Sequence, residues 1–227
     1  MSAPLVALTL RATRAEHGEA REALARDWLR WCARQGLRPL LVPLGQEDPV
    51  EWLRALSPAG LVLTGGNDLG PAAGGLSPPG GSVDEARDRG ERALLTHALE
   101  SGLPVLGVCR GLQLIAAFHG APLRRVAPER AHVGAHEVAL EGPLAAAVGA
   151  AARVNSFHDQ GVPLAGLPAP LEALAGSPDG LCEALRVRGA PVWAVQWHPE
   201  REGGDDPATA WVLERWRARL GRPERGP

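Results

Sequence analysis

The stretch that decides the fold is Pro104-Val-Leu-Gly-Val-Cys-Arg-Gly-Leu-Gln113. Its apolar residues 105–108 predict a buried strand, and residues 111–119 predict a helix. Cys109 lies between them with a glycine two residues away on each side, which is typical of a nucleophile elbow. Larger side chains at Gly107 and Gly111 would collide in such a sharp turn. The turn points the Cys109 sulfur at the helix N-terminus, whose partial positive charge favours the reactive thiolate.

A second segment, Val192-Trp-Ala-Val-Gln-Trp-His-Pro-Glu200, carries a histidine and a carboxylate at the end of a predicted strand. Pro199 ends the strand because it has no N–H to donate. Residues two apart in an extended segment face the same side, so Glu200 can reach His198 and fix its tautomer. Cys109, His198 and Glu200 are therefore the candidate triad for acyl transfer to a thiol. Alone, each segment also fits a structural explanation: a buried cysteine with chance glycines, and a solvated glutamate at a strand end.

Short apolar runs alternate with amphipathic segments through the first half of the chain, the pattern of a parallel sheet covered by helices. The predicted strands are 5–10, 40–42, 60–64 and 105–108, and the predicted helices are 49–56, 111–119 and a helix with Leu24, Trp28, Trp31 and Cys32 on one face. Ser82 and Glu85 predict a capping box that opens a further helix. The glycine- and proline-rich segment Gly65–Gly81 is predicted to be a loop.

After Gly120 the chain changes to short strand-like pieces, which we expect to be antiparallel or edge additions to the central sheet. These pieces are residues 123–126, 133–140, 153–155, 171–175, 181–187 and 192–197. Asp206 and Pro207 predict the N-terminus of a last helix. We find neither an internal repeat nor a linker in the sequence, and we expect residues 1–227 to form a single domain.

Composition excludes several classes of function. The chain has 227 residues and a net charge of −2, so it lacks the basic footprint of a nucleic-acid-binding protein. All 24 basic residues are Arg, which excludes a lysine Schiff base and a P-loop lysine, and Tyr is absent. No run approaches the ~18 apolar residues of a membrane span. Three cysteines, an odd number, argue for a reducing compartment. Residues 3–10 read as a first strand and not as a signal peptide, so we expect a cytoplasmic protein.

His132 and His136 are four residues apart, a spacing that on a helix can hold a metal ion. Here the neighbouring valines and glycine indicate a loop running into a strand, and no third ligand accompanies the pair. We therefore expect a polar pair or a substrate-side contact, and no metal. Cys32, on a helix core face, and Cys182, in a strand-like run, are predicted to be packing residues.

The chain resembles the class I glutamine amidotransferase-like proteins and, within them, the γ-glutamyl hydrolase group, peptidase family C26. The shared stretches follow the family's order and are Leu63-Thr-Gly-Gly-Asn-Asp68, Arg87-Asp-x-x-Glu91, Pro104–Gln113, Val154-Asn-Ser-Phe-His158 and Gln196-Trp-His-Pro-Glu200. The Cys-Arg-Gly form of the elbow and the Asn-Ser-x-His segment favour the γ-glutamyl hydrolase branch. The resemblance implies an α/β fold, a three-layer flavodoxin-like sheet with a mostly parallel centre and antiparallel additions.

The resemblance also implies a role for each matched residue. Cys109 attacks the γ-carbonyl of a γ-glutamyl amide and forms a thioester. His198 moves the proton to the leaving amine and then activates water, while Glu200 holds the imidazole. The backbone N–H groups of Gly66 and Arg110 stabilise the oxyanion.

Substrate binding follows from the same resemblance. Gln113 and the segment Asn155-Ser156-x-His158 would hold the α-amino and α-carboxylate groups of a small-molecule γ-glutamyl substrate. No cofactor, nucleic acid or membrane is expected, and a homo-oligomer or a synthetase partner stays open. Three departures from the family leave the leaving group open. They are Asn67 in place of a third glycine, Ala116-Ala117 with His119-Gly120 after the elbow helix, and the insert Gly70–Gly81.

Two alternatives to a stand-alone hydrolase remain. The chain could be a glutaminase component that passes ammonia to a separate synthetase, because no synthetase domain is fused here. It could also be a catalytically idle glutamyl-binding regulatory protein, against which the intact triad argues. A redox-sensing cysteine protein is a minor option that would not need His198-Pro199-Glu200.

Overall fold

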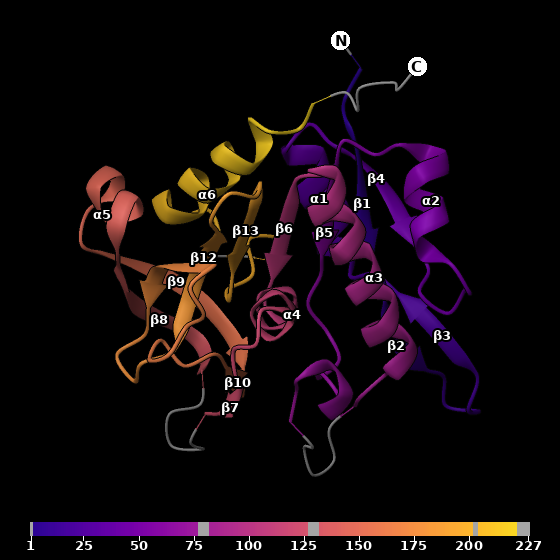
Figure 1. Cartoon of the computed structure of the whole chain (residues 1–227), viewed down its shortest axis with the longest axis horizontal. Helices are drawn as coiled ribbons and strands as arrows, with labels where there is room; N and C mark the ends of the chain where they lie inside the picture. The colour runs from indigo at the N-terminus through magenta and orange to yellow at the C-terminus, as the bar shows by residue number, and fades with distance from the viewer. Residues whose placement is uncertain (1, 77–81, 127–131, 202–203, 222–227) are drawn as a thin grey trace.

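One mixed sheet runs through the computed structural model, which describes residues 2–76, 82–126, 132–201 and 204–221 (Figure 1). Within these residues the sheet has nine strands. In spatial order they are β4 (Arg38–Val42), β1 (Leu5–Thr9), β5 (Gly60–Leu63), β6 (Val105–Val108), β13 (Val192–Val195), β12 (Cys182–Val187), β11 (Leu171–Gly176), β8 (His132–Leu140) and β9 (Ala151–His158). The strands from β4 to β13 are parallel, and those from β13 to β9 pair antiparallel. The predicted parallel centre with antiparallel additions is confirmed.

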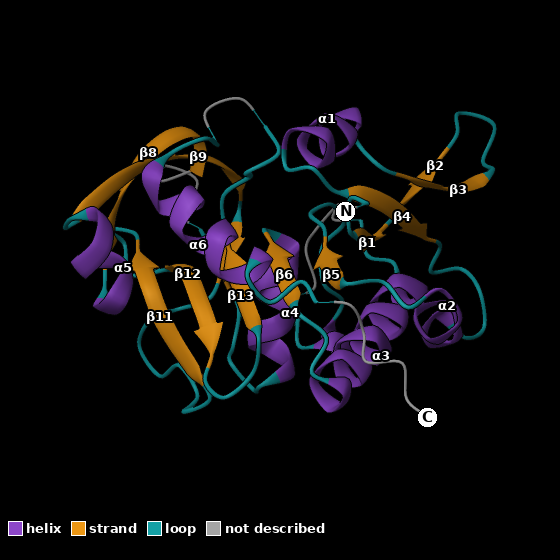
Figure 2. Ribbon diagram, turned by 90° about the horizontal axis from the view of Figure 1, so that it is seen from above, coloured by secondary structure: helices purple, strands orange, loops and turns teal. Residues whose placement is uncertain are grey.

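Helices cover both faces of this sheet, which gives three layers (Figure 2). One face carries α1 (Arg26–Arg34), α5 (Gly142–Val148) and α6 (Pro207–Arg217), and the other carries α2 (Pro49–Leu56), α3 (Glu85–Ser101) and α4 (Arg110–Phe118). On the first face, the rings of Trp31 and Trp216 stack with centroids 6.3 Å apart. On the second face, Leu94, Leu95 and Leu112 are fully buried. The predicted three-layer α/β fold is therefore correct.

Several predicted boundaries agree with the structure, and one cap does not. Helix α2 and strand β6 have the predicted bounds, and Asp206 caps α6 by accepting hydrogen bonds from the N–H groups of Ala208 and Thr209. Helix α3, however, is capped by Asp84 and not by Ser82. The Asp84 carboxylate accepts a hydrogen bond from the N–H of Arg87, 2.8 Å away, so the capping position is two residues later than the Ser82–Glu85 spacing predicts.

The sequence patterns did not predict one hairpin, one short helix and one two-residue strand of the structure. Strands β2 (Arg11–Arg14) and β3 (Ala20–Ala23) form an exposed hairpin outside the main sheet, and their arginines and glutamate show no apolar alternation. Helix α5 starts at Gly142 and Pro143. Strand β7 (Arg124–Arg125), inside the predicted strand 123–126, pairs with β10 (Gln160–Gly161), which was not predicted. The predicted Gly65–Gly81 loop contains one 3₁₀ turn, Pro71–Ala73, and residues 77–81 lie outside the described part.

None of the helices in the described part of the chain is both long enough and apolar enough to span a membrane.

Candidate active site

Cys109 occupies the turn between β6 and α4, close to the middle of the sheet. Its φ of 55° and ψ of −105° lie outside the usual regions for a side-chain-bearing residue. The N–H of Cys109 donates to the carbonyl of Val195 on β13, 2.8 Å away, which continues the ladder into the turn. A Cβ atom on Gly107 would lie 2.6 Å from Ile115, and one on Gly111 would lie 2.2 Å from the Leu63 carbonyl. Only glycine fits at these two positions, as the elbow motif predicts.

His198 and Glu200 meet at the end of β13, directly beside β6. The Nδ1 atom of His198 lies 2.7 Å from Oε1 of Glu200, and both side chains are almost completely buried. Burial lowers the pKa of His198, but the Cys109 sulfur and the Glu200 carboxylate outweigh it and raise that pKa to about 9. The imidazole is therefore held in its charged form at neutral pH. A thiol, an imidazole and a carboxylate coupled in this order are the arrangement required for acyl transfer to sulfur.

Asn155 on β9 fixes the backbone of His198. Its Oδ1 atom accepts a hydrogen bond from the His198 N–H at 2.8 Å, and its Nδ2 atom donates to the His198 carbonyl at 2.9 Å. On the other side, the indole N–H of Trp197 donates to Thr209 at the start of α6, 2.7 Å away. The strand end that presents His198 is thus held from both sides by buried polar groups.

The loop after β5 lies against the same site. A Cβ atom on Gly65 would lie 3.0 Å from the His198 ring and 3.5 Å from Cys109. Gly66 has a φ of +133°, and a Cβ there would lie 2.6 Å from the Arg87 guanidinium and 2.8 Å from Arg11. Close backbone approach and positive φ therefore both require glycine in this loop.

A buried network of two arginines and two carboxylates supports this loop. Arg87 donates to the carbonyls of Thr64 and Gly65, at 2.8 and 3.0 Å, and to Glu91 at 3.0 Å. Glu91 also pairs with Arg110, the residue after the nucleophile. Burial opposes ionisation of Glu91, but the two guanidinium groups outweigh it and hold its pKa below the usual value.

Asp88 completes the network, since it pairs with Arg110 and accepts the Gly70 N–H at 2.9 Å. The Arg87-Asp-x-x-Glu91 motif therefore ties the glycine loop of residues 65–70 to the elbow through α3. Asn67 contributes to the same anchoring. Its side chain makes two 3.0 Å hydrogen bonds with the backbone of Ala12 on β2, which fixes this position of the loop.

Three further residues expected at the substrate are also buried, and each contacts the protein itself. Gln113 donates to the carbonyl of Gln160 at 3.0 Å, Ser156 donates to the carbonyl of His132 at 2.9 Å, and Nδ1 of His158 lies 2.9 Å from the Gln160 carbonyl. Gln113 borders the elbow from α4, while Ser156 and His158 belong to β9 beside Asn155.

The comparisons with known proteins agree with this arrangement. A family model described as Peptidase C26 matches residues 4–200. The chain belongs to the peptidase C26 family. The C26 match contains the elbow, the glycine loop and the His198–Glu200 pair. The described residues outside the match, 2–3, 201 and 204–221, include α6, which holds Trp197.

Relatives of this C26 chain carry two kinds of name. It is 38% identical over 157 residues to a putative glutamine amidotransferase-like protein of Lactococcus lactis, covering 62% of this chain and 65% of that protein. It is 30% identical to a γ-glutamyl-CDP-amidate hydrolase of Campylobacter jejuni, covering 87% and 89%, and 30% identical to a γ-glutamyl-γ-aminobutyrate hydrolase of Escherichia coli K12, covering 88% and 87%. The chain spans between 51% and 65% of the length of the first three curated relatives.

Solved structures share the fold. A glutamine amidotransferase of Thermotoga maritima superimposes with a TM-score of 0.62 at 18% identity, covering 95% of this chain and 81% of that one. A glutamine amidotransferase of Methylobacillus flagellatus superimposes with a TM-score of 0.66 at 16% identity, covering 98% and 97%. At these identities the likeness shows the α/β architecture alone.

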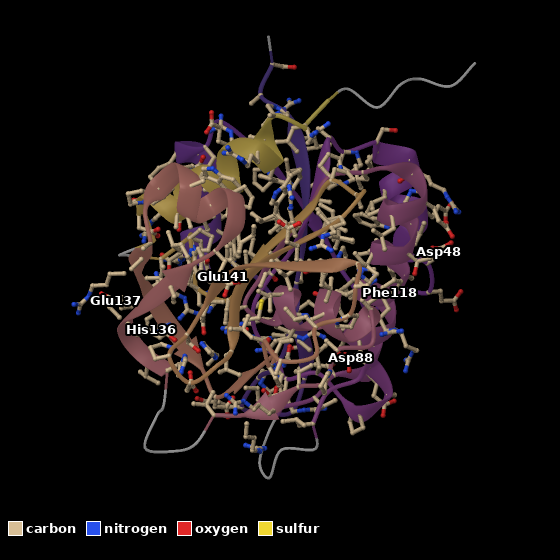
Figure 3. The ribbon with its side chains drawn as sticks, turned by 60° about the vertical axis from the view of Figure 1, so that its left-hand side comes forward. Asp48, Asp88, Phe118, His136, Glu137 and Glu141 are labelled. Carbon is tan, nitrogen blue, oxygen red and sulfur yellow. The ribbon has the colours of Figure 1, made fainter. Side chains whose placement is uncertain are left out.

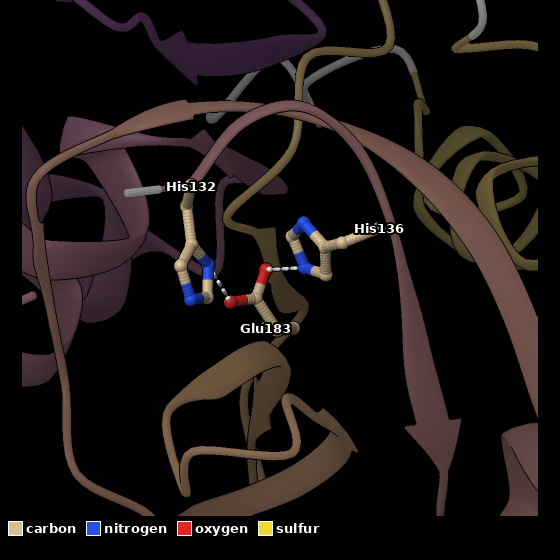
Figure 4. Close-up of side chains that lie close together, drawn as sticks. All are labelled: His132, His136 and Glu183. Atoms are coloured by element: carbon tan, nitrogen blue, oxygen red, sulfur yellow. Dashed lines mark ion pairs between the residues drawn. The ribbon is translucent and has the colours of Figure 1, made fainter. Parts of the chain in front are cut away.

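A second cluster of ionisable side chains lies on the antiparallel side of the C26 fold. His132 and His136 on β8 converge on Glu183 of β12, and their ligand-type atoms all lie within 4.8 Å of one another (Figure 4). The expectation that no third ligand accompanies this histidine pair was wrong, because the sheet brings in a residue about 50 positions away in sequence. A signal was present in the sequence: Glu183 is a lone carboxylate in the otherwise apolar run 181–185.

Charges in this cluster perturb one another. Burial raises the pKa of Glu183, but His132, His136 and His158 outweigh it and lower that pKa to about 2. Burial lowers the pKa of His158 to about 4, despite the attraction of Glu183. His158 is thus neutral and Glu183 charged at neutral pH.

The other two cysteines are core residues, as predicted. Cys32 packs with Trp28 and Trp31 of α1, and burial raises the pKa of its thiol to about 11. Cys182 packs on the opposite face of the sheet.

Proposed function

We propose that this C26 protein is a hydrolase that cleaves a γ-glutamyl amide bond through a thioester on Cys109. The observation that carries the proposal is the position of Cys109 at a strained elbow, coupled to the buried His198–Glu200 pair. The relatives named γ-glutamyl hydrolases, 30% identical over most of the chain, support the substrate class.

The proposed reaction has two halves. The Cys109 thiolate attacks the γ-carbonyl carbon, and the N–H groups of Gly66 and Arg110 stabilise the oxyanion that forms. The His198 imidazolium donates its proton to the departing amine, which breaks the C–N bond and leaves a γ-glutamyl thioester. His198, now neutral, removes a proton from water as it attacks the thioester. Glutamate leaves and the thiolate is restored, while Glu200 keeps the imidazole oriented throughout.

Residues around the elbow would recognise the glutamyl group. We propose that Gln113 and the segment Asn155-Ser156-x-His158 border its α-amino and α-carboxylate groups. Asn155 and His158 then contribute through what they position, since Asn155 holds the His198 backbone and His158 faces the carbonyl of Gln160. No cofactor takes part in these steps. The three cysteines are unpaired, which supports a reducing compartment such as the cytoplasm.

The test is glutamate release, measured by mass spectrometry, from glutamine and from a panel of γ-glutamyl amides. The panel includes γ-glutamyl-γ-aminobutyrate, γ-glutamyl-CDP-amidate and γ-glutamyl peptides. Cys109→Ala is the control and is expected to abolish release without unfolding the protein. Rapid quenching of the wild-type reaction is expected to trap a protein whose mass has increased by one glutamyl group, and that adduct should be missing from Cys109→Ala.

The alternatives predict different results from the same panel. Release that is slow and restricted to glutamine favours a glutaminase component with a separate synthetase. No release from any amide, with glutamyl compounds still binding, favours a regulatory protein. Turnover that persists in Cys109→Ala contradicts the proposed mechanism.

A further inference from the structure

The four residues His132, His136, His158 and Glu183, here called the His–Glu cluster, lie together on β8, β9 and β12. Neighbouring side chains on β8 point to opposite faces of the strand. His136 is half-buried on one face, while Glu137 is exposed on the other and points away from the molecule (Figure 3). The proton transfers proposed above do not involve any atom of the cluster. Of its four residues, only His158 belongs to the segment proposed to border the glutamyl group, and the function of the other three is a separate question.

Three atoms of the cluster form a nearly regular triangle. Nδ1 of His132 lies 3.1 Å from Nε2 of His158 and 3.5 Å from Oε1 of Glu183, and the third side, from His158 to Glu183, is 3.6 Å. A point equidistant from atoms with these separations lies about 2.0 Å from each. Bonds from zinc to imidazole nitrogen and carboxylate oxygen have that length, about 2.0–2.2 Å.

The outer nitrogens of both histidines already face acceptors. Nδ1 of His158 lies 2.9 Å from the Gln160 carbonyl, which can only accept a hydrogen bond, so Nδ1 carries a proton. Nε2 of His132 lies 3.3 Å from the Asp179 carboxylate. With a proton on each outer nitrogen, Nδ1 of His132 and Nε2 of His158 face each other across 3.1 Å, so either a shared proton or a metal ion can lie between them. Outer-nitrogen contacts to carbonyl and carboxylate oxygens are what metal-binding histidines usually make.

Glu183 supplies the negative charge. Its side chain is fully buried, and among the described residues neither of its oxygens has a partner within hydrogen-bonding geometry. The three imidazoles approach it only at 3.5–3.6 Å. A buried carboxylate without hydrogen bonds is costly, and coordination to a cation removes that cost. His136 approaches the second oxygen, at 3.6 Å, and neither of its ring nitrogens has a hydrogen-bond partner in the described part of the chain.

We propose that the His–Glu cluster binds a divalent transition-metal ion, with zinc the best fit. His132 Nδ1, His158 Nε2 and Glu183 Oε1 are the first three ligands, and His136 on the pocket side is the fourth. Imidazole and carboxylate donors in a four-ligand set suit zinc better than calcium or magnesium, which take more oxygen ligands. A surface pocket of about 510 Å³, bordered by His132, His136 and Asp179, gives the ion a route from solvent.

The ion would join β12 to the β8–β9 pair. Residue 158 lies on the same strand as Asn155, which holds the His198 backbone. Binding would therefore stiffen the strand that positions the catalytic imidazole, without placing the metal at the reacting atoms. Metal binding at this cluster does not depend on which substrate the enzyme takes.

The test uses full-length Cys109→Ala protein, so that the thiolate at the candidate active site cannot capture the ion. Zinc is titrated in competition with a chromophoric chelator, and bound metal is counted by elemental analysis after dialysis. We expect one zinc per chain and a higher Tm with zinc. Cobalt(II) in place of zinc is expected to give the intense visible absorption of a four-coordinate site.

Matched variants assign the site. Glu183→Gln and His132→Asn are expected to weaken zinc binding at least about tenfold, and Asp179→Asn by about 10–100-fold through its outer contact to His132. The control is His17→Asn, which removes an exposed histidine that lies 3.2 Å from Glu19, and it is expected to leave affinity unchanged. Asp179 sits at the pocket, so its variant serves even if a change at the buried Glu183 prevents folding.

Two results overturn the proposal. One is a folded Cys109→Ala protein that binds no stoichiometric zinc at neutral pH, which leaves a shared proton as the occupant of the cluster. The other is zinc binding of equal affinity in the parent, Asp179→Asn and His132→Asn proteins, which places the metal elsewhere.

Discussion

Nδ1 of His198 lies 2.7 Å from Oε1 of Glu200, with only Pro199 between the two residues. The strand ends just before them, so the pair depends on a tight local turn and not on the sheet ladder. Because the contact is buried, the carboxylate acts on the imidazole with little screening by water.

Glu200→Gln is expected to lower kcat by roughly 10²–10⁴, because an amide still orients the ring but no longer stabilises its charge. The pH profile provides a second test. The pKa of His198 is about 9, so wild-type kcat is expected to fall as pH rises through that value and the imidazolium loses its proton. Since the carboxylate raises this pKa, the falling limb is expected at lower pH in Glu200→Gln. If kcat fell at the same pH in Glu200→Gln as in wild type, this role for Glu200 would be contradicted.

The same pKa predicts a change of stability with pH. The folded value of about 9 lies above the ordinary value of 6.5, so the charged form of His198 stabilises the fold. That contribution is complete below about pH 6.5 and is lost as pH rises through 9. Chemical denaturation of wild type and His198→Gln between about pH 6 and pH 10 checks this. The difference between the two proteins is expected to shrink at high pH.

Gly66→Val is expected to lower kcat by roughly 10²–10³, the usual effect of losing one oxyanion donor. The added side chain would run into Arg87 and Arg11, and the backbone φ of +133° would change. Gly18→Ala is the control, since Gly18 also has a positive φ, +89°, but has open space around it. Steady-state kinetics of both variants decide the matter, and equal losses in kcat would contradict a specific role for Gly66.

Asn155→Ala is expected to lower kcat by about 10–10², with KM nearly unchanged, because a displaced imidazole impairs proton transfer more than binding. Asn155→Asp keeps an acceptor for the His198 N–H and is expected to recover part of the loss. A variant whose defect lies wholly in KM would instead indicate that Asn155 contacts the glutamyl group directly.

Glu91→Gln is expected to destabilise the fold by about 3–5 kcal/mol, since it leaves the buried Arg87 and Arg110 with one carboxylate fewer. Arg89→Gln on the same helix is the control. It breaks a solvent-exposed pair with Glu85, 3.5 Å apart, and is expected to have no measurable effect on urea unfolding. Similar unfolding midpoints for wild type and Glu91→Gln would contradict the structural importance of this network.

Much of the fold was predictable because its local signals agree with its tertiary contacts. All four residues of Val105–Val108 are buried, so this strand needs packing partners on both faces, which a position in the middle of the sheet provides. Gly107 and Gly111 then specify the turn at Cys109. The hairpin β2–β3 was not predictable, because it is stabilised by exposed polar residues and by the distant Asn67. Periodicity carries no information about such contacts.

The candidate site also has one contact that was predictable from the sequence and one that was not. His198 and Glu200 are two residues apart in sequence, so their contact is local and was predictable, although a turn after β13 forms it and not the extended alternation assumed from the sequence. Glu183 was not connected to His132 and His136, because that contact depends on the strand order β12-β11-β8 in the sheet. Strand order is a property of the whole fold, and short-range patterns do not contain it.

Cys109 is 9% exposed, whereas Cys32 and Cys182 are fully buried and burial raises the pKa of each of their thiols. A small alkylating reagent will therefore consume one equivalent per correctly folded chain. A misfolded chain exposes all three thiols, so consumption above one equivalent per chain measures the misfolded fraction of a preparation. Rates for the other variants can then be expressed per working site, which separates a slow enzyme from a partly misfolded one.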